Sequence, residues 1–226
     1  MKRLAFSMVA MALVAISFAS AQPLPPQALH RFGTSRFCTQ AEVVNLSLSD
    51  DARLLAAADR DGRVYLWDVA TGEERLVLPA DSGKRVAISP DGRWLALGED
   101  GAFEVRSLVK KEQPRLPLGN APRAFAFSRD SKRIVVASAD DDAVAIFDVE
   151  SAREARRLSG LKGVPVSVAF SPDGHWVAAA TMPPEEDGTP KLRIFLWDAR
   201  KGGASIRAME HEGKSIRGLS FLPDNQ

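Results

Sequence analysis

The chain repeats an alternation of large apolar and small residues that ends each time in a polar turn. The five turns have the sequence Ser-Pro-Asp-Gly or a variant of it, and their aspartates lie 40, 39, 43 and 51 residues apart. Residues five and three positions before each aspartate are large and apolar: Leu46 and Leu48, Val86 and Ile88, Phe125 and Phe127, Val168 and Phe170, Leu219 and Phe221. The residue between them is Ser or Ala. This alternation predicts a β-strand that is closely covered on both faces.

Further short runs follow each turn within a period of about 40 residues. The first unit has a second apolar run at 53–58, a third at 64–68 and a fourth, more polar run at 75–78. Four short strands per period are typical of a β-propeller blade. The sequence therefore predicts an all-β propeller of four-stranded blades, with four complete units and a started fifth. The expected units are 34–68, 74–106, 115–148, 155–198 and the partial 204–226.

The four tryptophans occupy only two positions of the repeat. Trp94 and Trp176 lie three residues after the turn aspartate, whereas Trp67 and Trp197 immediately precede an aspartate. This regular placement favours a packing role over ligand binding. The repeat residues expected to be structural are Trp67, Asp68, Asp91, Asp173, Trp197 and Asp198.

These residues resemble the WD40 (G-protein β-like) repeat family, through Tyr65-Leu66-Trp67-Asp68 with Thr71-Gly72, through 195–198, and through the two full Ser-Pro-Asp-Gly turns. Residues 29–37 are similar to the lead-in of exported bacterial WD40-repeat proteins, and the similarity covers roughly 29–226. The resemblance implies a protein-interaction scaffold and a ring of about seven blades. An incomplete or split ring is therefore expected here, with Thr34–Cys38 as the candidate strand that completes a last blade.

The N-terminus has the pattern of a secretory signal peptide. Two basic residues are followed by an uncharged apolar stretch at 4–19 and by Ala19-Ser20-Ala21, which a signal peptidase accepts. The apolar run is shorter than the roughly 20 residues that cross a bilayer, which favours cleavage after Ala21 over an uncleaved anchor. We expect a signal peptide at 1–21, a Pro-rich spacer at 22–28 and the propeller at 29–226, in a periplasmic or secreted protein without stable membrane insertion after cleavage.

Charge and cysteine content narrow the classes of partner. The net charge of the chain is +1, and loss of Lys2 and Arg3 leaves 28 Lys and Arg residues against 29 Asp and Glu. A near-neutral domain has no strong field for nucleic acid. Cys38 is the only cysteine, so an internal disulfide is excluded, and burial as a small hydrophobe is favoured over pairing with a partner.

The sequence offers no motif for catalysis, a cofactor or a metal. The histidines, His30, His175 and His211, stand far apart at unrelated repeat positions, and the segment 59–62 lacks the third ligand and the distal Glu of a calcium loop. A non-enzymatic protein is therefore expected. Two alternatives stay open: an exported enzyme or small-ligand or metal binder that uses the central channel, and a truncated gene fragment without independent function.

A candidate binding face follows from the resemblance. Acidic residues gather between the second and third predicted strands, and in WD40 proteins these turns share a face with the loops that lead into each first strand. This implies a mixed-charge face around the channel mouth. Its candidate protein-binding residues are Lys84, Arg123, Arg217, Asp140, Asp141, Glu185 and Glu186. Exposed polar turns without any partner explain the same residues. The partners are unknown, and open propeller edges also offer a route to an oligomer.

Overall fold

The computed structural model describes residues 37–79, 82–99, 102–109, 122–138, 141–182, 191–204, 207–212, 216 and 218–222. Within these ranges every regular element is a β-strand. This confirms the all-β fold predicted from the repeat. The expected signal peptide at 1–21 and the spacer at 22–28 lie outside the described residues.

The first two sheets form the N-terminal half of the fold. The first is antiparallel, in the order β1 (Val43–Leu48), β2 (Leu54–Asp59), β3 (Val64–Asp68) and β4 (Glu74–Leu78). The second has three strands in the described part of the chain, β5 (Arg85–Ile88), β6 (Trp94–Glu99) and β7 (Ala102–Ser107). Each sheet is a blade whose strands follow the order of the sequence.

The third and fourth blades repeat this order. The third contains β8 (Pro122–Phe127), β9 (Arg133–Ser138), β10 (Ala143–Asp148) and β11 (Glu154–Ser159). The fourth contains β12 (Val164–Phe170), β13 (Trp176–Met182), β14 (Lys191–Asp198) and β16 (Arg207–Glu212). Between β14 and β16 the short strand β15 (Gly203–Ala204) pairs in parallel with β11. The fourth blade thereby covers part of the outer edge of the third, where unpaired backbone groups would otherwise face solvent.

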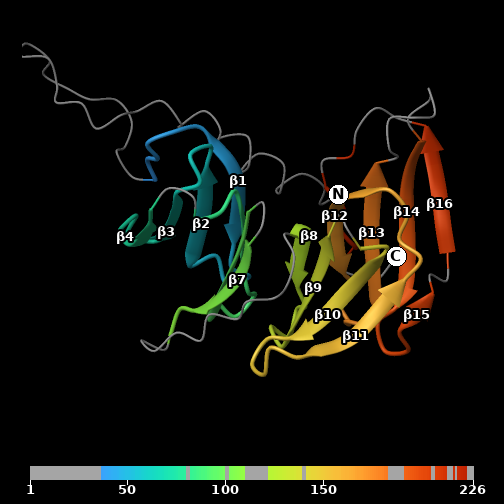
Figure 1. Cartoon of the computed structure of the whole chain (residues 1–226). Coiled ribbons are helices and arrows are strands. Elements are labelled where there is room, and N and C mark those ends of the chain that lie inside the picture. The colour runs from blue at the N-terminus through green and yellow to red at the C-terminus, as the bar shows by residue number, and fades with distance from the viewer. Residues whose placement is uncertain are drawn as a thin grey trace, which may run out of the picture.

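The first strands of successive blades lie side by side, because β1 contacts β5, β5 contacts β8 and β8 contacts β12. Figure 1 shows β1, β8 and β12 toward the middle of the molecule and β4 and β16 at its margins. The blades are therefore arranged around the first strands, as in a propeller.

Side chains of one first strand bind the backbone of the next. The backbone N–H of Val86 donates to Asn45 Oδ1 at 2.9 Å, and that of Leu219 donates to Ser167 Oγ at 3.1 Å. Asn45 and Ser167 occupy the same repeat position, six residues before the turn aspartate. The fifth unit thus begins against the fourth blade in the way that the second meets the first, although its described residues, 216 and 218–222, form no strand.

The apolar alternation of each first strand is used between blades. Val86 and Ile88 of β5 pack in one buried cluster with Leu54, Ala56 and Ala58 of β2. The equivalent residues of β8 and β12 join the clusters between the second and third and between the third and fourth blades. Because the second and third blades each have a neighbouring blade on both faces, a small residue is favoured at the intervening position of their first strands.

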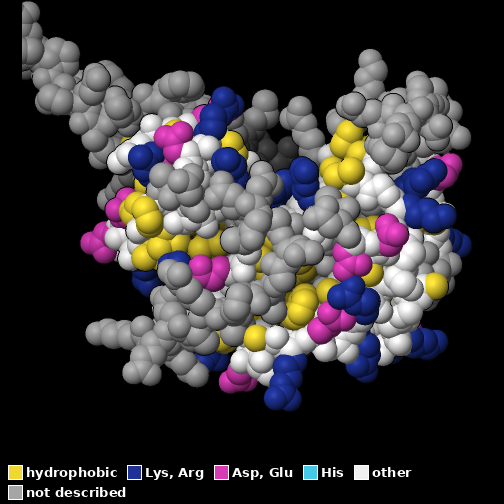
Figure 2. All heavy atoms as spheres, in the orientation of Figure 1, with side chains coloured by type: hydrophobic (Ala, Val, Ile, Leu, Met, Phe, Trp, Pro, Cys, Tyr) yellow, Lys and Arg dark blue, Asp and Glu magenta, His cyan; other side chains and the backbone are white. Residues whose placement is uncertain are grey.

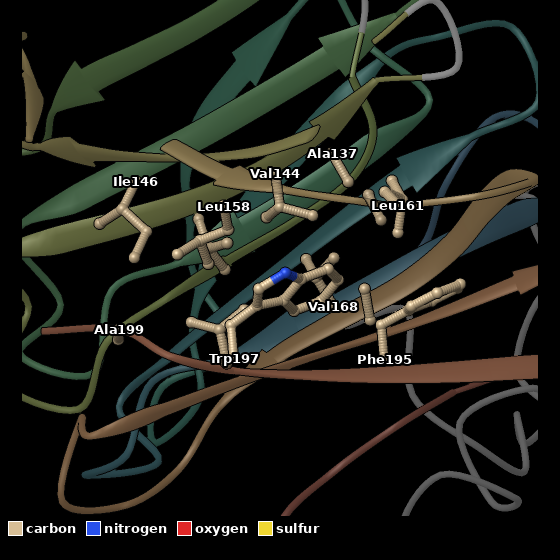
Figure 3. Packing of buried hydrophobic residues seen from close by; sticks show 13 residues of the cluster. Ala137, Val144, Ile146, Leu158, Leu161, Val168, Phe195, Trp197 and Ala199 are labelled. Carbon is tan, nitrogen blue, oxygen red and sulfur yellow. The ribbon is translucent and has the colours of Figure 1, made fainter. Parts of the chain in front are cut away.

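Trp197 lies at the centre of the contact between the third and fourth blades. Its side chain is fully buried, and its Nε1–H donates to the carbonyl oxygen of Ser159 at 2.9 Å. Figure 3 shows its indole between Val168 and Phe195 on one side and residues of the third blade, including Leu158, on the other. Aromatic packing with a satisfied N–H explains why the repeat has Trp here.

Trp67 occupies the same repeat position in the first blade. It stacks on Tyr65 with ring centroids 5.4 Å apart, and Phe37 meets it edge-on at 5.9 Å. Phe37 and Cys38, the described part of the segment 34–38, form a turn and an irregular residue. The segment's other residues lie outside the described ranges, so the strand expected there stays a prediction.

Candidate functional site

The connections between strands fall on two faces of the fold. On the first, here called the turn face, the Ser-Pro-Asp-Gly turns lie beside the turns between third and fourth strands; for example, the N–H of Val69 donates to the carbonyl of Arg53. On the second, here called the mouth face, loops into first strands lie beside turns between second and third strands. The N–H of Gly83 donates to Gly62 O at 3.2 Å, and that of Leu161 to Asp142 O at 3.0 Å.

Buried serines hold the turn face together. In each described turn the serine hydroxyl donates to the turn aspartate and accepts a backbone N–H from the following strand; these serines are Ser49, Ser89, Ser128 and Ser171. The hydrogen bond from the serine is the main cause that lowers the pKa of Asp51 and of Asp173. The turn aspartates, Asp91 among them, are therefore engaged by the fold.

Neighbouring blades are also joined on the turn face. The N–H of Asp50 donates to Pro90 O at 3.2 Å, and the N–H of Asp91 donates to Ser131 Oγ at 3.0 Å. Arg133 Nη2 continues the series by donating to Gly174 O at 3.2 Å. Many polar groups of this face are thus used to hold one blade to the next.

The aspartates that follow Trp67 and Trp197 close the other turns of this face. Asp68 accepts the backbone N–H groups of Ala70 and Thr71, and the bond from Thr71 is the main cause that lowers its pKa. Asp198 accepts both the backbone N–H and the side chain of Arg200, and the side-chain bond is the main cause that lowers its pKa. Both carboxylates act within their own turns.

Two acidic residues of the mouth face, Asp59 and Asp141, bind groups of their own blades. Asp59 is fully buried and accepts the N–H of Arg63 at 2.9 Å and the hydroxyl of Tyr65 at 3.3 Å. Asp141, a predicted binding residue, forms an ion pair with Arg157. Arg157 is also bound by Glu154, and the two carboxylates, Glu154 first, raise its pKa. The predicted residues Asp140, Glu185, Glu186 and Arg217 lie outside the described residues.

A hollow of about 180 Å³ lies where the first strands of the four blades meet. It is lined by Asn45, Arg85, Val86, Arg123, Ala124, Phe125, Val166, Ser167 and Val168. Arg85 begins β5 and Arg123 is the second residue of β8, so the hollow lies toward the mouth face, where the first strands start. Figure 2 shows Lys and Arg side chains at the left edge and the lower end of the gap between the two halves of the molecule.

The hollow brings Arg123, which the sequence singled out, together with Arg85, which it did not. Lys84 is exposed and does not line the hollow; its backbone N–H donates to Gly98 O at 3.1 Å. The missed signal is the repeat position six residues before the turn aspartate, where all four described units contribute a lining residue: Asn45, Arg85, Ala124 and Ser167. In β5, β8 and β12 the next residue is apolar and packs against the preceding blade. Because successive side chains of a strand point to opposite faces, a polar residue at this position lies on the face turned away from the preceding blade.

The described ranges contain no group of three or more His, Cys, Asp and Glu residues that could hold a metal ion. Nor does the part of the chain that the structure describes contain a helix long and apolar enough to span a membrane. His175 lies 3.1 Å from its neighbour Asp173 on the turn face, and His211 lies opposite Leu192 in β14.

Comparison with known proteins agrees with the repeat. The family model of the WD domain, G-beta repeat, matches residues 33–68 and 156–192. A WD repeat-containing protein of Synechocystis sp. is 30% identical over 141 residues, which are 60% of this chain and 40% of that protein. The chain is thus similar to WD40-repeat proteins, and the WD40 repeat is matched at two positions. The resemblance stated from the sequence is thereby confirmed.

The chain is also similar to animal proteins. It is 35% identical over 146 residues to WD repeat-containing protein 55 of Pongo abelii, covering 62% of this chain and 36% of the relative. It is 26% identical over 141 residues to guanine nucleotide-binding protein subunit beta-1 of Caenorhabditis briggsae, covering 59% of this chain and 41% of that one. The matches thus span about half or less of each relative's length.

Among solved structures, hydrazine synthase of Kuenenia stuttgartiensis is similar in fold, with a TM-score of 0.69 and 18% identity. The match covers 81% of this chain and 53% of the other. At this identity the likeness concerns the fold alone, because one fold hosts many unrelated functions.

Proposed function

We propose that this WD40-repeat protein is a non-enzymatic scaffold that is exported from the cytoplasm and binds other proteins through its mouth face. The observation that carries the proposal is the hollow between the first strands, with Arg123 exposed in its lining. WD-repeat relatives, including a G-protein β-subunit, support a scaffold. The periplasm or the extracellular space is the proposed location.

The contrast between the two faces supports the mouth face as the binding surface. On the turn face, serine hydroxyls, aspartates and backbone groups bind one another within and between blades. On the mouth face, Arg123 has no hydrogen bond or ion pair to any residue within the described ranges. Loops positioned by rigid blades are a common location for binding residues. Arg123 is therefore available to a partner on the mouth face, beside the hollow.

Charge reversal on the mouth face is expected to abolish partner capture. A double variant, Lys84→Glu with Arg123→Glu, places two negative charges where the wild type has two positive ones. Proteins cross-linked to the full chain in the cell envelope are then quantified by mass spectrometry. We expect recovery of a specific partner to fall by about tenfold or more, because like charges at an interface cost several kcal/mol.

The matched control reverses two exposed charges on the turn face, Arg53→Glu with Arg129→Glu. This variant changes the net charge equally and is expected to recover partners as the wild type does, with both variants cooperatively folded by thermal melting. Equal recovery by wild type and the mouth-face variant would contradict the proposed binding surface.

Export is tested at the N-terminus of the natural protein. Sequencing of the protein from the periplasmic and secreted fractions is expected to start at Gln22, because Ala19 and Ala21 are the small residues that a signal peptidase requires. Ala21→Arg is expected to leave residues 1–21 attached, and Ala28→Arg, outside the cleavage site, serves as the control. Protein found only in the cytoplasm with an intact N-terminus would overturn this part of the proposal.

A further inference from the structure

We infer that the hollow between the first strands binds a side-chain carboxylate of a partner protein, with Arg123 as its main ligand. This inference rests on the proposed function and deepens it, because it names the chemistry of the partner segment that docks at the channel mouth. An acidic stretch, rich in Asp or Glu, is the expected partner segment.

The charge of the lining is the first observation. Two of the nine lining residues, Arg85 and Arg123, carry positive charge, and the lining contains no Asp or Glu. The other seven lining residues are uncharged: Asn45, Val86, Ala124, Phe125, Val166, Ser167 and Val168. An exposed positive charge such as that of Arg123 attracts a counter-ion to the hollow. The hollow therefore favours an anion.

The second observation is the state of Arg123 among the arginines of the mouth face. Arg60 pairs with Glu42, Arg63 with Asp61 and Arg157 with Asp141. Arg123 is exposed at the hollow and pairs with none of the described residues. A guanidinium presents five N–H donors in a planar fork that matches a carboxylate. Arg123 is thus able to bind a carboxylate without breaking an existing ion pair.

The third observation is the kind of polar group that Asn45 and Ser167 offer. Asn45 Oδ1 already accepts the N–H of Val86, and Ser167 Oγ already accepts the N–H of Leu219. The amide N–H₂ of Asn45 and the hydroxyl hydrogen of Ser167 have no hydrogen-bond acceptor among the described residues. Both are donors, so they complement the acceptor oxygens of a carboxylate.

Size limits the hollow to a small ligand group. The volume of about 180 Å³ is smaller than the roughly 300–1,000 Å³ of sites for drug-sized ligands. It exceeds the roughly 30 Å³ of one water molecule several times over. The end of an Asp or Glu side chain fits this space, while the rest of a partner chain lies across the surrounding mouth face. A small free carboxylate fits the same space, so the assignment to a protein rests on the proposed scaffold function and not on the volume.

The test measures binding of two labelled peptides to the full chain by fluorescence anisotropy. One peptide alternates Glu with Gly, and the other has Gln in place of Glu. We expect the Glu peptide to bind the wild type about tenfold more tightly, since hydrogen bonds to charged groups are the stronger ones. Its advantage is expected to shrink at physiological salt, because salt screens exposed charges.

The decisive comparison is Arg123→Gln against Arg129→Gln. Arg129 is an exposed arginine six residues away, in the turn between β8 and β9 on the turn face, so its loss changes the net charge equally. We expect Arg123→Gln to weaken the Glu peptide about tenfold and leave the Gln peptide unchanged, and Arg129→Gln to keep wild-type affinity for both. Equal affinity for the two peptides, or equal losses in the two variants, overturns the inference.

Two further results separate the possible failures. If succinate binds the wild type as tightly as the Glu peptide does, the site takes a free small carboxylate and the assignment to a protein is wrong. If partner capture needs the mouth face but Arg123→Gln does not affect the Glu peptide, the carboxylate site fails while the proposed scaffold function stands. If Glu-peptide binding needs Arg123 but the mouth-face variant captures partners as the wild type does, the proposed function fails and the carboxylate site stands.

Discussion

Trp197→Ala is expected to lower the free energy of unfolding by about 3–5 kcal/mol, the range for truncation of a buried aromatic side chain. Trp197 is fully buried in the cluster that joins the third and fourth blades, with Val144, Leu158 and Val168 in the same cluster. Truncation leaves a cavity between two packed sheets and removes the donor to Ser159 O. Because this contact holds two blades together, the loss acts on the cooperative unit. Urea unfolding followed by circular dichroism measures the change.

Two variants separate packing from hydrogen bonding at this site. Trp197→Phe retains an aromatic ring but loses the N–H, and its expected cost, about 2 kcal/mol, is smaller than that of Trp197→Ala. Trp176→Ala removes the same atoms from a partly exposed position, where a smaller cavity is left. A cost for Trp197→Ala no larger than for Trp176→Ala would contradict the packing of the third blade against the fourth.

Gly163→Ala is expected to destabilise the fold by about 2–4 kcal/mol, the sum of a backbone and a steric cost. Gly163 has a φ of +93°, which L-residues with a side chain rarely adopt. A Cβ there would lie 2.5 Å from the carbonyl oxygen of Met182 and 3.2 Å from Thr181 Oγ1. The backbone of β13 cannot yield easily, since it is paired with both β12 and β14. Thermal and urea unfolding measure the loss.

Gly203→Ala is the matched control for the steric part of this cost. Gly203 also has positive φ, +83°, but no atom lies within 4 Å of the position of its Cβ. Its expected cost is the backbone part alone, about 1–2 kcal/mol. Equal losses at the two glycines would show that the contact with Met182 does not constrain the loop into β12.

Similarity to an enzyme does not change the proposed function. The likeness to hydrazine synthase concerns the arrangement of strands, at 18% identity. Chemistry depends on groups that converge at a site, and propellers carry many different sites on one architecture. The groups that converge here are two arginines with Asn45 and Ser167 at the meeting point of four first strands. This set is suited to binding an anion.

The repeats allowed the fold to be predicted from the sequence. The predicted third run at 64–68 coincides with β3 (Val64–Asp68), and the predicted second run at 53–58 covers most of β2 (Leu54–Asp59). Local rules were sufficient because alternation selects a strand and the Ser-Pro-Asp-Gly turn ends it. Each unit repeats the same pattern, so an irregular unit could be aligned on the others. The pairing of β15 with β11 was not predictable, because it joins a short segment to a strand more than 40 residues earlier.

The sequence by itself determined the strands, their order in each blade and the apolar face that each first strand turns to its neighbour, because these depend on period-two patterning and local turns. Only the tertiary structure decided that Arg123 meets Arg85, Asn45 and Ser167 around one hollow. These residues come from four units, and which side chains converge depends on how the blades are placed around their first strands. That placement is set by packing between blades, which no local pattern encodes.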